Sequence, residues 1–162
     1  MRKRVYLETT VISYLTARPS RTLVGAAHQQ LTIDWWEQRR HDFDLVVSEL
    51  VLREAQAGDP DAAKRRLTIL EGIPRLALSD EAIALAQEFI QNGLLPLKAA
   101  DDGLHIAVAT TFSVDYLLTW NCTHIANPEL QAKLAEFLQQ RGLFLPFICT
   151  PEELLGGQDR EL

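Results

Sequence analysis

The stretch RVYLETTVISYL, residues 4–15, joins a strand pattern to a helix pattern with a carboxylate between them. Its apolar run VYL (5–7) is typical of a short buried strand. Glu8 follows where that strand should end, and Thr9 and Thr10 come before the next apolar run. We expect the two threonines to cap the helix that begins there. Glu8 is then either an incidental surface charge or one wall of a site.

Similar apolar runs alternate with helical patterns along the rest of the chain. The other strand candidates are FDLVVS (43–48), DYLLTW (115–120) and LFLPFI (143–148). The helical patterns cover residues 25–40, 59–72, 78–93, 99–112 and 127–142. In the last strand candidate, Pro146 suits an edge better than a centre, because proline cannot donate to a neighbouring strand. Strands that alternate with helices predict an α/β fold whose parallel sheet is covered on both faces.

The length and composition indicate one globular domain. Of the 162 residues, 47% are hydrophobic and 23% are charged, which is ordinary for soluble proteins. No apolar run approaches the roughly 20 residues that a membrane-spanning helix needs, and the N-terminus lacks the apolar region of a signal peptide. We therefore expect a cytoplasmic protein with one domain over 1–155 and a polar tail over 156–162. The two cysteines, Cys122 and Cys149, are too few for a disulfide scaffold and are not paired at zinc-ligand spacing.

The net charge limits the classes of nucleic-acid partner. A formal charge of −6 argues against a protein that coats nucleic acid electrostatically. It allows an enzyme whose acidic site reaches phosphates through bound metal ions. The basic groups at 39–40 and 64–66 are expected on solvated helix faces, with a track for phosphates as the alternative.

The predicted sheet sorts the polar residues by strand end. In open parallel sheets the ligand site lies beyond the carboxyl ends of the strands. Glu8 follows the first strand and Asn121 follows the run YLLTW, so both belong to that edge. Asp115 precedes its strand, which at roughly 3.3 Å per residue places it more than about 10 Å from the edge. We expect Asp115 to be structural.

Helical spacing separates the two glutamates of the segment SELVLREA. Glu49 lies four residues before Arg53, a spacing that suits an ion pair on a solvent face. Glu54 shares the apolar, inward face with Leu50 and Val51. A carboxylate there is costly unless it has a partner or binds a metal. Glu54 is therefore the candidate for a site.

The segment ADDGLHIAVA (100–109) offers a similar choice between two aspartates. Asp101 is placed to cap the helix, whereas Asp102 lies three residues before His105 and points along the buried helix. We favour Asp102 as the site residue. His105 is expected to be a core histidine with its hydrogen bonds satisfied rather than a ligand.

The candidate site thus comprises Glu8, Glu54, Asp102 and Asn121, which come from four separate elements. Carboxylate oxygens without histidine or cysteine ligands suit the hard cations Mg²⁺ or Mn²⁺. One or two such ions can orient a phosphodiester, activate water and stabilise the departing oxygen.

Four segments between residues 4 and 127 have an order and spacing that can be compared with known families: YLETTVISYL, VVSELVLREA, DDGLHIAVA and DYLLTWNCTHIAN. Together they resemble the PIN-domain ribonucleases, in particular the VapC-type toxins of bacterial toxin–antitoxin pairs. The resemblance implies a three-layer α/β/α fold with a central parallel sheet and an Mg²⁺- or Mn²⁺-dependent endoribonuclease. It also implies RNA as the substrate and an antitoxin as the protein partner.

The resemblance carries the acidic positions of that family onto this chain. They fall on Glu8, Glu54 and Asp102, and the fourth, usually an aspartate, falls on Asn121, with Thr119 as the hydroxyl residue near it. Glu8 is one methylene longer than the usual aspartate, and Asn121 lacks a charge, which weakens a second metal. We expect one firmly held ion and one transient ion.

The implied chemistry gives each residue a role. A metal held by Glu8 and Asp102 binds the scissile phosphate, and Glu54 positions the attacking water or a second ion. Cleavage then leaves a 5′-phosphate and a 3′-hydroxyl. Asp101 is the alternative source of the missing charge, and His124 is a possible phosphate contact.

Other functions remain open at this point. A PIN-like domain made inert by its Glu8 and Asn121 substitutions would bind RNA or an antitoxin without turnover. A phosphotransfer domain of similar architecture would need a nucleophilic aspartate at a strand end, but the predicted strands end in Glu8, Ser48 and Asn121. We also expect a homodimer or an antitoxin contact on the apolar surface of the helix that carries LTIDWW (31–36).

Overall fold

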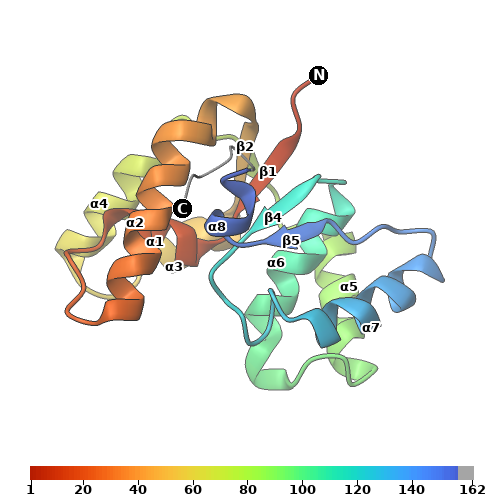
Figure 1. Ribbon diagram of the computed structural model, residues 1–162. Helices are drawn as coiled ribbons and strands as arrows, with labels where there is room; N and C mark the ends of the chain where they lie inside the picture. Colours follow the sequence, from red (N-terminus) through yellow and green to blue (C-terminus); the bar gives the residue numbers. More distant parts are fainter. Residues whose placement is uncertain (157–162) are drawn as a thin grey trace.

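The computed structural model describes residues 1–156, which form a five-stranded sheet between two layers of helices (Figure 1). The strands are β1 (Arg4–Leu7), β2 (Asp44–Ser48), β3 (Arg75–Leu76), β4 (Tyr116–Leu118) and β5 (Phe147–Cys149). The helices are α1 (Thr9–Thr16), α2 (Leu23–Arg39), α3 (Glu49–Ala55), α4 (Pro60–Leu70), α5 (Asp80–Gln91), α6 (Ala100–Thr111), α7 (Pro128–Gln139) and α8 (Pro151–Leu154). Short 3₁₀ helices cover Arg40–Asp42 and Leu97–Ala99.

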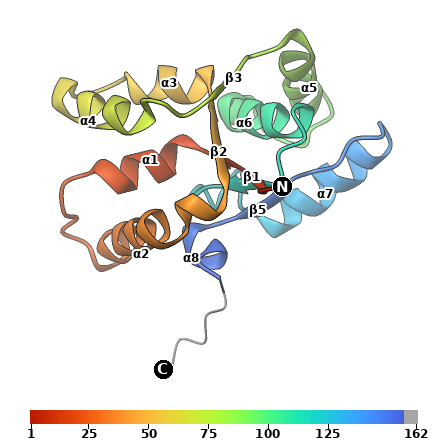
Figure 2. The ribbon, with the colours of Figure 1, turned by 90° about the horizontal axis from the view of Figure 1, so that it is seen from above.

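The sheet is parallel throughout, with the strand order β3-β2-β1-β4-β5. Seen from above, α5, α6 and α7 lie on one side of the sheet, and α1, α2, α3 and α4 lie on the other (Figure 2). The short helix α8 packs against α2. This confirms the predicted three-layer α/β/α architecture. The strand β1 is central, which explains why its apolar run, residues 5–7, is fully buried.

Most of the predicted elements are present. The five expected helices form as α2, α4, α5, α6 and α7, each within a few residues of the predicted ends. The first three strand candidates form as β1, β2 and β4. The last begins only at Phe147, because Pro146 has no N–H to donate to β4, and it lies at the edge of the sheet as expected.

Two short elements were not expected. The strand β3 has only two residues, too few for an alternating pattern to appear in the sequence. The helix α8 does carry a signal, because Thr150 and Glu153 form a reciprocal capping box around Pro151. The polar tail expected over 156–162 lies outside the described residues, apart from Gly156.

The core runs through the sheet and into α6. Seven residues of α6 are buried, including His105, and Trp35 of α2 is fully buried on the other side. Cys122 and Cys149 are both free thiols. Across residues 1–156, the helices are too short or too polar to cross a membrane.

Candidate active site

Glu8 lies at the end of β1 and is almost completely buried, with 3% of its surface exposed. It is the N-cap of α1, because its side chain accepts a hydrogen bond from the backbone N–H of Thr10 at 3.1 Å. Its Oε1 accepts bonds from the hydroxyls of Thr10 and, at 2.6 Å, Thr119. The prediction that Thr9 and Thr10 cap this helix was therefore wrong, since they form its first turn and Glu8 fills the cap position. Glu8 is one wall of a polar site.

The parallel register explains how Glu8 meets Thr119. Leu7 pairs with Leu118, so the next residue of each strand lies side by side at the carboxyl edge of the sheet. The backbone N–H of Trp120 then donates to the Thr10 hydroxyl at 2.9 Å. These bonds fasten the end of β4 to the start of α1.

Glu54 projects from α3 toward the same edge, and 31% of its side chain is exposed. Its Oε1 accepts a hydrogen bond from the Thr9 hydroxyl at 2.6 Å and lies 2.6 Å from Nε2 of His105. Burial raises the pKa of this carboxyl group. That effect is outweighed by the bond to His105, the attraction of that ring, the bond from Thr9 and the charge of Arg53, so the pKa lies below its usual value. Glu54 is therefore ionised at neutral pH.

His105 is fully buried and satisfied on both ring nitrogens, as expected. Its Nδ1 lies 2.6 Å from the hydroxyl of Tyr6, which in turn lies 2.7 Å from the hydroxyl of Ser48. Burial raises the pKa of Tyr6, its bond to Ser48 lowers it, and the nearby charges of Glu8 and Glu54 raise it further. The net shift is upward, so Tyr6 stays neutral.

Asp102 and Asn121 both contact His124, and neither hydrogen-bonds to His105. Oδ2 of Asp102 lies 3.2 Å from Nδ1 of His124, and both side chains are about one quarter exposed. Oδ1 of Asn121 accepts a bond from the backbone N–H of His124 at 3.0 Å. The N–H of Asn121 donates to Thr119 at 2.9 Å, which links this loop to Glu8. His124 is therefore the residue that joins these two candidates.

The described residues contain one tight group of possible ligands. Glu8, Glu54 and His105 each offer an atom within 4.8 Å of the others. Asp102 is not in this group, because its carboxylate is turned toward His124. The structure thus brings two of the four candidates together and places Asp102 and Asn121 beside them through the loop after β4.

The acidic residues that the sequence analysis did not choose for the site have other partners. Ala99, not Asp101, is the N-cap of α6, so the capping role expected for Asp101 was wrong. Asp101 lies 3.7 Å from Arg53, with 63% of each side chain exposed. Arg53 therefore pairs with Asp101 instead of with Glu49 as expected, because the start of α6 lies next to the end of α3.

Asp115 is structural, as predicted. It lies at the opposite end of the strands, where its Oδ2 accepts a bond from the backbone N–H of Arg4 at 2.8 Å. Lys3 lies 3.7 Å from its other oxygen. The carboxylate fastens the start of β1 to the start of β4.

The donor set fits a hard divalent cation. Glu54 keeps its Oε2, and Asp102 its Oδ1, free of hydrogen bonds within residues 1–156. Glu8 accepts only one N–H on its Oε2. These are carboxylate oxygens of the kind that Mg²⁺ and Mn²⁺ take. His105 is not needed as a ligand, because both of its nitrogens are already used.

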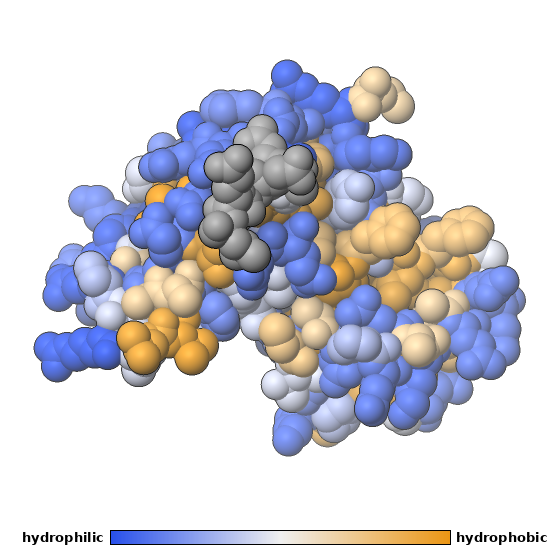
Figure 3. Space-filling view, viewed as in Figure 1, coloured by the Kyte–Doolittle hydropathy of each residue, from blue (hydrophilic) through white to orange (hydrophobic). Residues whose placement is uncertain are grey.

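The surface has a hollow at this edge. In the space-filling view, a notch at the lower side separates the half that carries α1, α2 and α4 from the half that carries α5, α6 and α7 (Figure 3). The ends of β1 and β4 and the starts of α3 and α6 point into the same region of the ribbon (Figure 1).

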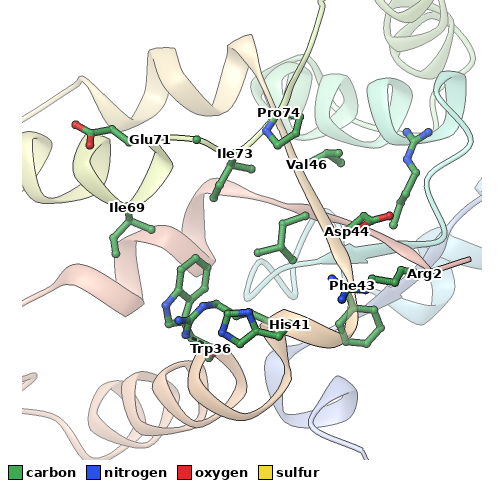
Figure 4. A pocket seen from close by; sticks show the side chains of 14 residues that line it. Arg2, Trp36, His41, Phe43, Asp44, Val46, Ile69, Glu71, Ile73 and Pro74 are labelled. Carbon is green, nitrogen blue, oxygen red and sulfur yellow. Dashed lines mark hydrogen bonds between the residues drawn. The ribbon is translucent and has the colours of Figure 1, made fainter.

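A second hollow lies at the other end of the strands. This groove has a volume of about 630 Å³ and runs over β2, between Trp36 and His41 on one side and Ile69 and Ile73 on the other (Figure 4). Its lining also includes Arg2, Arg4, Arg40, Asp44 and Glu71. It contains none of the four candidate residues.

The fold can be compared with solved structures. No protein-family model and no curated protein matches the chain. A chain of the VapBC2 complex from Rickettsia felis, bound to a promoter DNA fragment, matches with a TM-score of 0.58 and 16% identity over 91% of this chain and 98% of that one. The fold is that of the VapC structures. It is a PIN-like fold.

A second structure agrees with this result. VapC20 from Mycobacterium tuberculosis, described as a toxin that cleaves the sarcin–ricin loop, matches with a TM-score of 0.58 and 14% identity. The match covers 74% of this chain and 92% of VapC20. At such low identity the likeness to VapC structures establishes the fold, and the chemistry has to be argued from the residues.

Proposed function

We propose that this chain is an Mg²⁺- or Mn²⁺-dependent endoribonuclease and the toxin of a toxin–antitoxin pair. The observation that carries the proposal is the convergence of Glu8 and Glu54 at the carboxyl edge of a VapC-like sheet. In open parallel sheets this edge is where ligands bind. Asp102 lies beside the pair at the start of α6. VapC20, which shares the fold, is described as a toxin that cleaves the sarcin–ricin loop.

Each residue has a part in the proposed hydrolysis. Glu8 and Asp102 would hold the cation, and Glu54 would use its free Oε2 both as a further oxygen for the cation and to orient the attacking water. The bound cation supplies positive charge for the phosphate and activates the water. Thr9, with His105, keeps the Glu54 carboxylate ionised and fixed, so that little reorganisation is needed when the substrate binds.

Asn121 has a structural part in this proposal. Its Oδ1 is already used by the N–H of His124, so the side chain shapes the loop after β4. A neutral oxygen with an existing donor is a weak ligand for a second ion. We therefore propose one firmly bound cation, with any second ion held only transiently.

The partners follow from the same proposal. The R. felis match comes from a complex named VapBC2, which supports an antitoxin as the partner of this chain. RNA would be the substrate, in the cytoplasm. The surface expected from residues 31–36 is smaller than predicted, because Trp35 is buried in the core and Trp36 lines the groove over β2 (Figure 4).

One observation favours a second candidate, an inert PIN-like binding module. Glu8 caps α1 and accepts two hydroxyl bonds on one oxygen, so its carboxylate has a structural role without any metal. In that case the domain would bind RNA or an antitoxin without cleaving RNA. A phosphotransfer domain is not favoured, since β1, β2 and β4 are followed by Glu8, Glu49 and Thr119 and not by an aspartate nucleophile.

Two assays on the purified protein separate the candidates. Calorimetry measures Mn²⁺ binding, and a labelled single-stranded RNA reports cleavage with and without a chelator. The proposal expects saturable Mn²⁺ binding and cleavage that the chelator stops. RNA binding without turnover, or no Mn²⁺ binding, would favour the module.

A further inference from the structure

A chain of hydrogen bonds crosses the interior and ends on Glu54. It runs from Ser48 to Tyr6 at 2.7 Å, from Tyr6 to His105 at 2.6 Å, and from His105 to Glu54 at 2.6 Å. Ser48, Tyr6 and His105 are fully buried, whereas Glu54 reaches the edge. The members come from β2, β1, α6 and α3, so the chain ties four elements to one carboxylate.

The direction of each bond follows from what the atoms can donate. Glu54 is ionised, so Nε2 of His105 must carry the proton that it receives. The Ser48 hydroxyl oxygen accepts the N–H of Val51 at 3.3 Å, and within residues 1–156 Tyr6 is the one acceptor in reach of the Ser48 hydrogen, so Ser48 donates to Tyr6. The Tyr6 hydrogen then goes to Nδ1 of His105. With these directions one proton serves each link and every hydrogen in the series has an acceptor.

Burying this series of hydrogen-bonded groups costs free energy, and packing alone does not explain why polar side chains occupy these positions. Burying hydroxyl and imidazole groups is unfavourable unless all of their bonds are made, and apolar side chains of similar size would fill the same space. Here all of the bonds are made, and they converge on a single group at the candidate site. A fully satisfied buried network fixes the orientation of its members.

We propose that Tyr6 and His105 are positioning residues for Glu54. They hold Oε1 of Glu54 together with Thr9, and they thereby leave Oε2 as the oxygen that serves the cation and the attacking water. The inference rests on the proposed function for its consequence in catalysis. The assignment of donors and acceptors in the Ser48–Tyr6–His105–Glu54 hydrogen bonds does not depend on the proposed function.

The first test changes the donor to Glu54. In His105→Gln the amide nitrogen takes the place of Nε2, whereas His105→Leu removes the donor. We expect His105→Leu to weaken Mn²⁺ binding by roughly 10–100-fold and to lower kcat more than it changes KM, as for other partners of metal ligands. His105→Gln should restore most of the affinity. Equal losses in the two variants, or wild-type affinity in His105→Leu, would overturn the proposal.

Two further variants control for damage to the fold. Thr110→Val removes another buried hydroxyl from α6, one that bonds only to the carbonyl of Ile106, and it should leave Mn²⁺ affinity and kcat unchanged. Tyr6→Phe removes the outer link and keeps the ring in the core. If His105→Leu does not fold, Tyr6→Phe carries the test, with a reduced kcat expected and an unchanged kcat contradicting the proposal.

The second test does not depend on activity. Two-bond ¹H–¹⁵N spectra of the His105 ring in the metal-free protein should show that Nε2 is the donating nitrogen and Nδ1 the accepting one. In Tyr6→Phe, Nδ1 of His105 loses its hydroxyl partner, and the spectra should no longer show Nε2 as the one donating nitrogen. A proton on Nδ1 in the wild type would overturn the proposal even if RNA is cleaved. If the wild type shows the expected ring but does not cleave RNA, the proposed function fails and the proton assignment stands.

Discussion

At the scale of single residues, the longer side chain of Glu8 has a specific use. It caps α1 and at the same time reaches the Thr119 hydroxyl on the neighbouring strand, 2.6 Å from Oε1. An aspartate would be shorter by about one carbon–carbon bond, or about 1.5 Å, and would not make both contacts without a movement of the backbone. The glutamate therefore fits the hydroxyl groups around it.

Thr119→Val tests this arrangement. The variant removes a donor to a buried carboxylate and an acceptor for the N–H of Asn121. We expect it to lower the free energy of unfolding by about 1–3 kcal/mol, measured by urea denaturation. Thr119→Ser keeps the hydroxyl and should stay close to the wild type. Equal stability of the valine and serine variants would show that the bond contributes nothing.

Glu54 makes stability depend on pH. Its pKa in the folded protein lies below the usual value of 4.5, so the carboxylate contributes stability that is present above that pH and is lost as the pH falls through the folded pKa. We expect the metal-free protein to lose stability as the pH falls below about 4.5. Glu54→Gln should lose less over the same range. A variant with the same pH dependence as the wild type would assign the effect to other groups.

At the scale of elements, the strand ends were the part of the site that the sequence could predict. Glu8 and Asp115 were sorted correctly because a parallel sheet has two distinct edges, and strand patterns locate both. The cap of α1 was mispredicted because glutamate is an unusual N-cap, whereas threonine is a common one. The bonds of Tyr6 and His105 were out of reach, since they join residues 99 positions apart and exist only once α6 packs on β1.

The opposite edge of the sheet supplies a prediction of its own. Asp115→Ala leaves the N–H of Arg4 without its acceptor and should cost about 1 kcal/mol of stability. Because this residue lies at the amino ends of the strands, Mn²⁺ affinity should not change. Chemical denaturation and calorimetry on the same sample check both statements. A large loss of Mn²⁺ affinity would contradict the separation of the two edges.

At the scale of the whole molecule, the expected homodimer stays a prediction. Trp35 is part of the core, so the helix α2 offers its apolar residues mainly at its start, where Leu23 and Val24 are 93% and 67% exposed. Phe144 and Phe147, near the edge strand β5, are 83% and 75% exposed. Figure 3 shows apolar side chains on both sides of this face. Light scattering over a wide concentration range should give twice the chain mass of 18.3 kDa, and a monomer throughout would contradict the expectation.

The proposed activity belongs to the whole assembly of β1, α3, α6 and the loop after β4. The most direct measurement is the initial rate at which Asp102→Asn cleaves a single-stranded RNA in Mn²⁺, beside the wild type. The variant keeps the size of the side chain and should keep the fold, as judged by circular dichroism and thermal unfolding. We expect its rate to fall by roughly a hundredfold or more, because a charged ligand for the cation is lost. Cleavage at the wild-type rate by a folded Asp102→Asn would contradict the account.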